Sequence, residues 1–328
     1  MRKFIVKRIL LSILILFCVT FIIYALMRAL PTSFVESMAM QLAQAPGSKP
    51  YNEWLDQLNA AYGLDMELIP GYLTWLKGAI VGNFGDSWKY SVPVLQKFNE
   101  VIWLSFIMGG IAFILELIIA IPLGVIAATK QYSKADYAIT AGALLGISLP
   151  TFFFATLLKL AFAVNLKWFE LSGLVSRDYP QLDAWGQFLD KANHLVLPIA
   201  TLVIVSVGSL MRYTRTNMLE VLNSDYIRTA RAKGLSERKV IYHHAFRNTL
   251  IPLVTIVGGS LPGLFSGALI TETLFSIPGI GFTSYTAMTA GDIPFSMFYM
   301  TFLAVLTLLG NLISDILYAV VDPRVRIA

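Results

Sequence analysis

Long apolar runs, almost free of charged side chains, set the strongest limit on what this chain can fold into. A helix needs about 20 apolar residues to cross the hydrocarbon core of a bilayer. Six runs reach that length, the fourth only just; they are 9–27, 101–129, 137–158, 195–211, 249–271 and 293–314, and only Glu116 interrupts them with a charge. The composition agrees, because 56% of the 328 residues are hydrophobic and 14% are charged, unlike a soluble globular protein. We therefore predict an all-α polytopic membrane protein with about six transmembrane helices.

The first run also has features of a secretory signal peptide, because the basic cluster Arg2–Arg8 precedes it. It is longer than the roughly 7–15 apolar residues of a signal peptide, however, and no A-x-A cleavage site follows. We therefore expect a retained helix. Cys18, the single cysteine, lies inside it, so the sequence offers no disulfide framework.

The positive charges indicate which helix ends face the cytoplasm. With the N-terminus inside, most of the 25 Lys and Arg residues fall in short inside segments, whereas the others are spread over longer outside loops. Short loops rich in Lys and Arg remain cytoplasmic, so we predict that both termini are cytoplasmic. The net charge of +5 then reflects membrane orientation, and we expect no nucleic-acid partner.

The longest inside segment, 223–248, is strongly basic but retains several apolar residues. Asp225 can cap a first helix, Gly234 can end it in a left-handed turn, and Ser236 can cap a second helix. The sequence therefore predicts a short helix, a sharp glycine turn and a helix that returns to the membrane. Such an element is suited to binding a cytoplasmic partner, although many multi-spanning proteins have an ordinary basic loop here.

Part of this segment, Y-I-R-T-A-R-A-K-G-L-S, resembles the "EAA" cytoplasmic loop of ABC-importer permeases, in the version found in peptide and nickel permeases. Against the general E-A-A-x-x-x-G pattern only Ala230 and Gly234 match, because Arg228 and Thr229 occupy the first two positions. The resemblance implies a coupling helix that docks in a groove of an ATPase subunit. The residues implied in coupling are Asp225, Tyr226, Ile227, Arg228, Thr229, Ala230, Arg231, Ala232, Lys233, Gly234 and Leu235.

The resemblance extends over the whole chain. Y-L-T-W-L followed by G-N-F-G-D-S, T-E-T-L-F-S-I-P-G-I-G (271–281) and the terminal D-P-R-V-R are similar to segments of the peptide-type permeases, specifically the B-type subunit. This implies the type I ABC-importer permease fold, with a re-entrant or periplasmic gate at 271–281. Candidate pathway or gate residues are Glu272, Phe275, Pro278, Gly279, Gly281, Pro262, Lys159 and Asp315.

Each of these candidates has a simpler explanation. Glu272 could simply cap its own segment, Lys159 could extend to the membrane interface, and Asp315 could pair with a polar neighbour. The stretch V-G-G-S-L-P-G-L-F-S-G-A (257–268) predicts a distorted fifth helix around Pro262, which fits either a gated pore or tight helix packing. G-I-S-L-P-T-F (146–152) likewise predicts a kink in the third helix.

The sequence suggests three regions. Residues 1–30 are the first transmembrane helix with a cytoplasmic N-terminus, 31–100 form an extracytoplasmic segment, and 101–328 are the core permease domain, which includes 223–248. Within 31–100 the spacing predicts one or two surface helices over 62–78, with Trp75 and Trp88 as interfacial anchors. The segment is equally suited to bracing helix ends and to docking a substrate-delivery protein.

No catalytic or phosphate-binding motif is present, so the chain itself is predicted to be neither an enzyme nor an ATP-binding protein. His243 and His244 are adjacent and cannot share a metal ion as an i, i+4 pair could, and we expect no metal site. The resemblance implies a prokaryotic cell-membrane complex with a second homologous permease, two ATPases that bind ATP and Mg, and an extracytoplasmic substrate-binding protein.

Peptide is the substrate that we favour, with nickel or a metal chelate as the alternative. An ion-driven secondary transporter would need charged residues on several helices, and Glu116, Lys159 and Asp315 are too few to favour one. An intramembrane enzyme would need paired acidic or histidine residues near an interface, which the sequence does not show.

Overall fold

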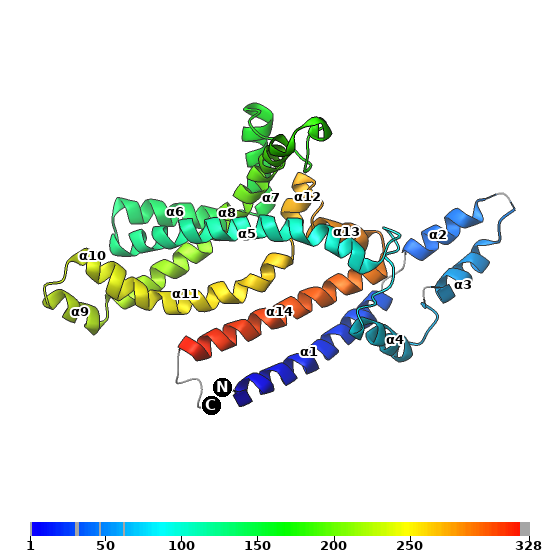
Figure 1. Ribbon diagram of the computed structural model, residues 1–328, viewed down its shortest axis with the longest axis horizontal. Helices are drawn as coiled ribbons and strands as arrows, with labels where there is room; N and C mark the ends of the chain where they lie inside the picture. Colours follow the sequence, from blue (N-terminus) through cyan, green and yellow to red (C-terminus); the bar gives the residue numbers. More distant parts are fainter. Residues whose placement is uncertain (1, 30–32, 46, 62, 322–328) are drawn as a thin grey trace. The chain divides into compact units, whose positions relative to one another are not determined.

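The structure, a computed structural model, describes residues 2–29, 33–45, 47–61 and 63–321. Helices dominate the described residues (Figure 1). In chain order they are α1 (Arg2–Ala29), α2 (Ser33–Ala43), α3 (Tyr51–Ala61), α4 (Leu68–Ile80), α5 (Val94–Thr129), α6 (Lys134–Ser148), α7 (Thr151–Leu158), α8 (Ala184–Leu222), α9 (Asp225–Ala232), α10 (Glu237–Lys239), α11 (Phe246–Ser260), α12 (Leu269–Phe275), α13 (Ile280–Thr289) and α14 (Ile293–Val321).

Four of these helices, α1, α5, α8 and α14, are long and apolar enough to cross a membrane. Two further helix pairs meet the same test together but are bent: 134–148 with 151–165 by 105°, and 237–250 with 252–265 by 49°. If each bent pair is one span, the described residues contain six, in agreement with the predicted six-helix, all-α membrane protein.

The structure corrects the shape of the third and fifth predicted helices. The third is broken rather than kinked, because Leu149 and Pro150 are both extended, with ψ of 139° and 145°. Proline disfavours the helical region for the residue before it, so α6 ends there and α7 leaves in a new direction. In the fifth, the 49° bend lies at Pro252. Pro262 instead lies in a short 3₁₀ turn, Leu261–Phe265, and the chain is not helical between that turn and α12.

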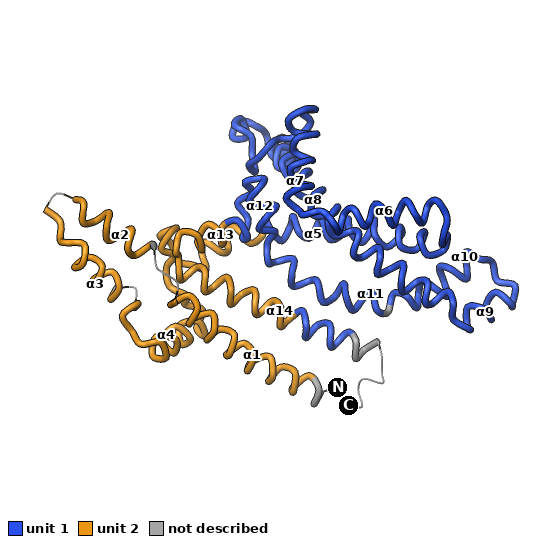
Figure 2. Tube along the Cα trace, turned by 180° about the vertical axis from the view of Figure 1, so that it is seen from behind, with its two compact units in different colours: residues 1, 104–282, 310–328 blue, residues 2–103, 283–309 orange. Residues whose placement is uncertain are grey.

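The described helices form two compact units (Figure 2). Among the described residues, unit 1 comprises 104–282 and 310–321, and unit 2 comprises those of 2–103 and 283–309. The predicted gate segment and the 223–248 segment both belong to unit 1.

In unit 2, the start of the predicted extracytoplasmic segment packs on the first helix. Tyr72 of α4 is buried, and its hydroxyl lies 3.0 Å from Thr20 Oγ1 and 3.1 Å from the Phe17 carbonyl of α1. The Arg28 guanidinium donates to the carbonyls of Gly63, Leu64 and Met66. These bonds satisfy carbonyl groups of the loop before α4 and tie that loop to the last turn of α1.

The two predicted tryptophan anchors also belong to this packing. Trp75 and Trp88 are half-buried in the cluster around Tyr72, and Trp88 stacks on Phe34 of α2. Leu68, the first residue of α4, is exposed. The two indole rings therefore contribute to the core of unit 2.

A second polar network in unit 2 fixes the turn at 82–90. The Asp292 carboxylate accepts from the Phe295 amide at 3.1 Å, which caps α14, and from the Ser87 hydroxyl and the Lys89 amide. Tyr90 donates its hydroxyl proton to the Thr283 carbonyl at 3.0 Å. Burial, and then the nearby Asp292 charge, raise the pKa of Tyr90 to about 12, so its hydroxyl remains a donor at neutral pH.

In unit 1, small residues allow α6 and α8 to lie in close contact. A Cβ added to Gly208 would lie 2.5 Å from the Ala143 carbonyl oxygen, and one added to Gly146 would lie 2.7 Å from that of Ile204. Such contacts are typical of helices that associate within membranes. Arg215 of α8 also donates two hydrogen bonds of 2.8 Å to Asp136 of α6. Together these contacts give α8 a fixed position on α6.

The glycine-rich part of the fifth predicted span packs in the same way. A Cβ on Gly310 of α14 would lie 2.8 Å from the Gly259 carbonyl oxygen, and Ser314 lies next to Gly259. Tight helix packing therefore accounts for Gly258 and Gly259, since Gly258 also contacts Leu317.

Candidate functional site

The 223–248 segment forms the predicted helix, turn and second helix, and it lies at one end of unit 1 (Figure 1). Gly234 follows α9 with φ of +74°, a left-handed conformation that residues with a Cβ rarely adopt. Its amide donates to the Arg231 carbonyl at 2.9 Å and closes the last turn of α9. The predicted glycine turn is confirmed.

The predicted helix caps are only partly right. Ser224 takes the N-cap position of α9 and Asp225 is the first helical residue. The Ser224 hydroxyl donates back to the Val221 carbonyl at 2.6 Å, so no side chain caps α9. Ser236 does hold the N-cap position of α10, also without a side-chain hydrogen bond.

One face of α9 is anchored in the core of unit 1. Ile227 is fully buried and Ala230 nearly so, and both pack in a cluster with partners from several helices. Leu235, just after the turn, packs on the same cluster. The buried partners are Val125 and Ala128 of α5, Met218 of α8, and Val240 and Ala245 at the start of the helix that leads into α11. The buried face of α9 therefore shares one apolar cluster with α5, α8 and the start of α11.

The opposite face of α9 is exposed and basic. The exposed candidate residues are Asp225, Tyr226, Arg228, Thr229, Arg231, Ala232, Lys233 and Gly234. Tyr226 leaves 48% of its surface exposed. The Arg231 guanidinium donates two hydrogen bonds to Glu237 across the turn, at 2.7 and 3.2 Å. This ion pair raises the pKa of Arg231 above its ordinary value and links the two helices across the turn.

The second group of candidate residues surrounds Glu272. Its carboxylate is fully buried and accepts from the Ser105 hydroxyl at 2.7 Å, the Ala268 amide at 3.0 Å and the Phe282 amide at 2.9 Å. Ala268 immediately precedes α12, and Phe282 lies in the first turn of α13. A negative charge is favourable at helix N-termini, so Glu272 stabilises the start of both helices.

The glycines of P-G-I-G are required by this carboxylate. A Cβ on Gly279 would lie 2.5 Å from the Glu272 carboxyl carbon, and one on Gly281 would lie 3.0 Å from its Oε2. Pro278 is exposed between them and the buried Phe275. The structure therefore brings Glu272, Phe275, Pro278, Gly279 and Gly281 together in one compact turn.

The other three candidates lie apart from the groups that contact Glu272. Lys159 donates its Nζ to the Leu274 carbonyl at 2.6 Å, where the C-terminus of α12 attracts a positive charge; it does not line the two cavities beside Glu116. Pro262 is buried beside Gly310, and Asp315 is half-buried on α14. The D-P-R-V-R segment lies outside the described residues.

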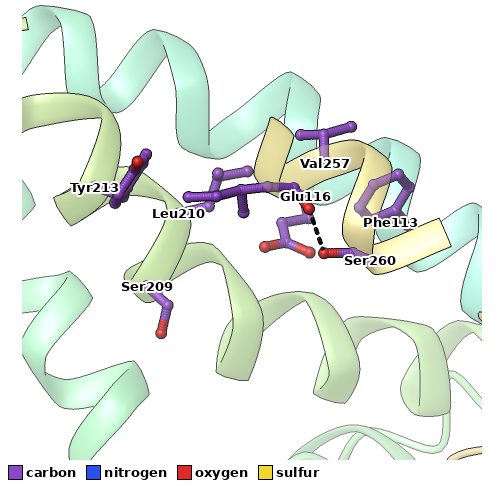
Figure 3. A pocket seen from close by; sticks show the side chains of 8 residues that line it. Phe113, Glu116, Ser209, Leu210, Tyr213, Val257 and Ser260 are labelled. Atoms are coloured by element: carbon purple, nitrogen blue, oxygen red, sulfur yellow. Dashed lines mark hydrogen bonds between the residues drawn. The ribbon is translucent and has the colours of Figure 1, made fainter. Parts of the chain in front are cut away.

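Sequence reasoning gave no role to Glu116, yet the structure places it at a hollow between α5, α8 and α11 (Figure 3). This cavity has a volume of about 290 Å³, and a second one of about 200 Å³ shares Phe113 and Glu116 with it. The sequence feature that could have indicated a role for Glu116 is its position as a lone charge inside an apolar run. In the part of the chain that the structure describes, three or more potential metal ligands nowhere come together.

Residues 120–327 match the family described as "Binding-protein-dependent transport system inner membrane component". Residues 1–125 match "Binding-prot-dependent transport system membrane comp, N-term". The two matches together cover nearly the whole chain and overlap within α5.

Curated relatives align over their full length. The oligopeptide transport system permease protein AppB of Bacillus subtilis (strain 168) is 36% identical over 327 residues, covering 99% of this chain and 100% of AppB. The dipeptide transport system permease protein DppB of Escherichia coli (strain K12) is 35% identical over 343 residues, covering 99% of both chains. The di/tripeptide transport system permease protein DppB of Pseudomonas aeruginosa (strain UCBPP-PA14) is 35% identical, also over 99% of both.

Among solved structures, the MetNI methionine ABC transporter in an inward-facing conformation is similar, with a TM-score of 0.51. The match covers 70% of this chain and 97% of the other, at 14% identity, and so concerns the fold alone. It agrees with the predicted ABC-importer permease fold. Fold, family profile and full-length relatives lead to one conclusion: this chain belongs to the binding-protein-dependent transport system inner membrane components, multi-pass proteins of the bacterial inner membrane.

Proposed function

We propose that this chain is the permease subunit of an ATP-driven importer of peptides. Support for the substrate class comes from relatives named for oligopeptide, dipeptide and di/tripeptide transport, at 35% or 36% identity over nearly the whole chain. The chain would form half of the translocation pathway, and a second, homologous permease would form the other half. As a membrane component it is a non-catalytic subunit.

The anchoring of α9 is the observation that carries the proposal. Ile227 and Ala230 fix one face of α9 in the core, while Tyr226, Arg228 and Lys233 remain exposed on the other. An exposed basic helix tied to α5, α8 and α11 can both bind a partner and transmit its movement. We assign this face to docking in a groove of an ATPase subunit.

The energy then comes from partner subunits. Two ATPases bind ATP and Mg, close on each other, and draw the α9 helices of the two permeases together. Because α9 is packed on three long helices, this movement opens the translocation pathway between the two permeases outward. An extracytoplasmic substrate-binding protein then releases its peptide into it. Hydrolysis restores the inward-facing state.

This function assigns places to the regions of the chain. Both termini and the 223–248 segment are cytoplasmic, 1–30 is the first span, 31–100 is extracytoplasmic, and 101–328 is the core domain. The compact turn around Glu272 lies near the outer end of the pathway, where it would form a rigid part of the gate.

Co-purification from native membranes tests the coupling assignment. We expect two ATPases and a second permease to accompany the wild-type chain. Tyr226→Ala and Arg231→Glu should release the ATPases while the second permease stays bound. Tyr137→Ala is the matched control, since Tyr137 on α6 is also exposed, at 63%, but lies outside the docking face. ATPases that remain bound to both variants, or a wild-type chain that purifies alone, would contradict the proposal.

A further inference from the structure

Two adjoining cavities in unit 1 are apolar except for one carboxylate and several hydroxyl groups. Glu116 is the only charged residue among the described residues that line either cavity. The hydroxyl groups that line the cavities come from α5, α8 and α11; they belong to Ser105, Ser206, Ser209, Tyr213 and Ser260, and that of Ser105 already donates to Glu272. Figure 3 shows the Glu116 side chain extending from α5 toward Ser260.

The carboxylate retains most of its hydrogen-bonding capacity. The Ser206 hydroxyl lies near this carboxylate but donates to the Val203 carbonyl at 3.3 Å, and the Ser260 hydroxyl donates to the Ile256 carbonyl at 2.9 Å. No salt bridge within the described residues involves Glu116. An ionised carboxylate can accept about four hydrogen bonds, so the cavity offers an unfilled acceptor.

Comparison with Glu272 shows that this arrangement differs from a structural carboxylate. Glu272 is fully buried and accepts three hydrogen bonds from its own unit, so it has little left to offer a ligand. Glu116 is half-buried in the middle of a membrane-spanning helix, where a charge is costly unless it faces a polar cavity and a partner.

We propose that Glu116 binds the ammonium group of a peptide in transit. The surrounding hydroxyl groups would form hydrogen bonds with the peptide's adjacent backbone groups. An ammonium group donates up to three hydrogen bonds to a carboxylate and hydroxyls. A cavity of about 290 Å³ is at the small end of ligand sites, so it takes one end of a peptide and not the whole molecule. The inference rests on the proposed peptide import.

The first test is ATP-driven uptake of trialanine by the complete complex in proteoliposomes. Glu116→Gln should slow uptake roughly tenfold, the effect of losing one charge-assisted hydrogen bond, and recovery of the assembled complex checks that the variant folds. Glu116→Asp should retain most of the uptake. Glu100→Gln is the matched control, because it removes another carboxylate from α5. The Glu100 carboxylate lies outside the cavity and pairs with Lys97 at 2.9 Å.

The second test does not need transport. A hydrophobic carbodiimide should label Glu116 in the detergent-solubilised complex, as read by mass spectrometry. Trialanine should slow this labelling, and N-acetyl-trialanine, which lacks the ammonium group, should not.

The outcomes separate this site from the import function. A wild-type complex that shows no ATP-driven uptake contradicts peptide import, while the labelling result still decides the site. Equal protection by both peptides, or by neither, overturns the ammonium site. Normal uptake by Glu116→Gln also overturns the ammonium site. Wild-type uptake that a protonophore abolishes overturns it as well, because Glu116 would then carry a proton.

Discussion

At the residue scale, the most informative side chain is the buried Glu272 carboxylate. It joins Ser105 of α5 to the start of α12 and the first turn of α13. Lys159 binds the opposite end of α12 through the Leu274 carbonyl. One short helix thus has a negative charge at its N-terminus and a positive charge at its C-terminus, which is the favourable arrangement at both ends.

Replacing Glu272 by Ala should destabilise the protein strongly. The change leaves one hydroxyl and two amides of unit 1 without an acceptor, each at a cost of about 1–3 kcal/mol. We expect the thermal unfolding midpoint in detergent to fall by several degrees, and Glu272→Gln, which keeps an acceptor oxygen, to fall less. Glu100→Ala serves as the control, since its carboxylate is largely exposed. An unchanged midpoint for Glu272→Ala would contradict the structural role.

At the scale of elements, helix positions follow from the sequence but helix shapes depend on packing. The apolar runs predicted the spans, yet the 49° bend falls at Pro252 and the 105° break at Leu149–Pro150. Proline marks where a helix can bend, and its neighbours decide whether it does. Pro122 lies inside α5, which continues to Thr129.

Gly234 offers a direct test of the coupling element. Its φ is +74°, and a Cβ there would meet nothing within 4 Å, so only the backbone conformation opposes a side chain. Gly234→Val should strain the turn by roughly 1–2 kcal/mol and uncouple ATP hydrolysis from uptake. Membrane insertion should be normal. Gly234→Asn is the matched control, because Asn adopts the left-handed region more readily. Equal transport by wild type and Gly234→Val would show that the turn is not part of coupling.

The limits of the sequence are clear from particular residues. Gly234 could be predicted because a left-handed turn needs glycine, whereas the cap of α9 was misplaced because Ser224 and Asp225 are both good capping residues. The bonds from Lys159 to Leu274 and from Ser105 to Glu272 join residues 115 and 167 positions apart. No local pattern shows such pairs. Glu116 was visible as a lone charge, but its cavity exists only once three helices are assembled.

At the scale of the whole molecule, the chain is a membrane component that, in the proposed function, takes its energy from partner subunits. The family match and the full-length relatives establish an inner membrane component of a binding-protein-dependent system. In the proposed function the α9 face is where an ATPase subunit docks, and the cavity beside Glu116 is where we propose that the peptide ammonium group binds. An ion-driven transporter would differ in one respect that can be measured, namely the source of its energy.

Peptide uptake by the reconstituted complex, with ATP and ion gradients varied independently, tests whether ATP is the energy source. We expect uptake that requires ATP and the substrate-binding protein, and that persists when ionophores remove the proton and sodium gradients. Uptake without ATP that follows an imposed proton or sodium gradient would contradict it.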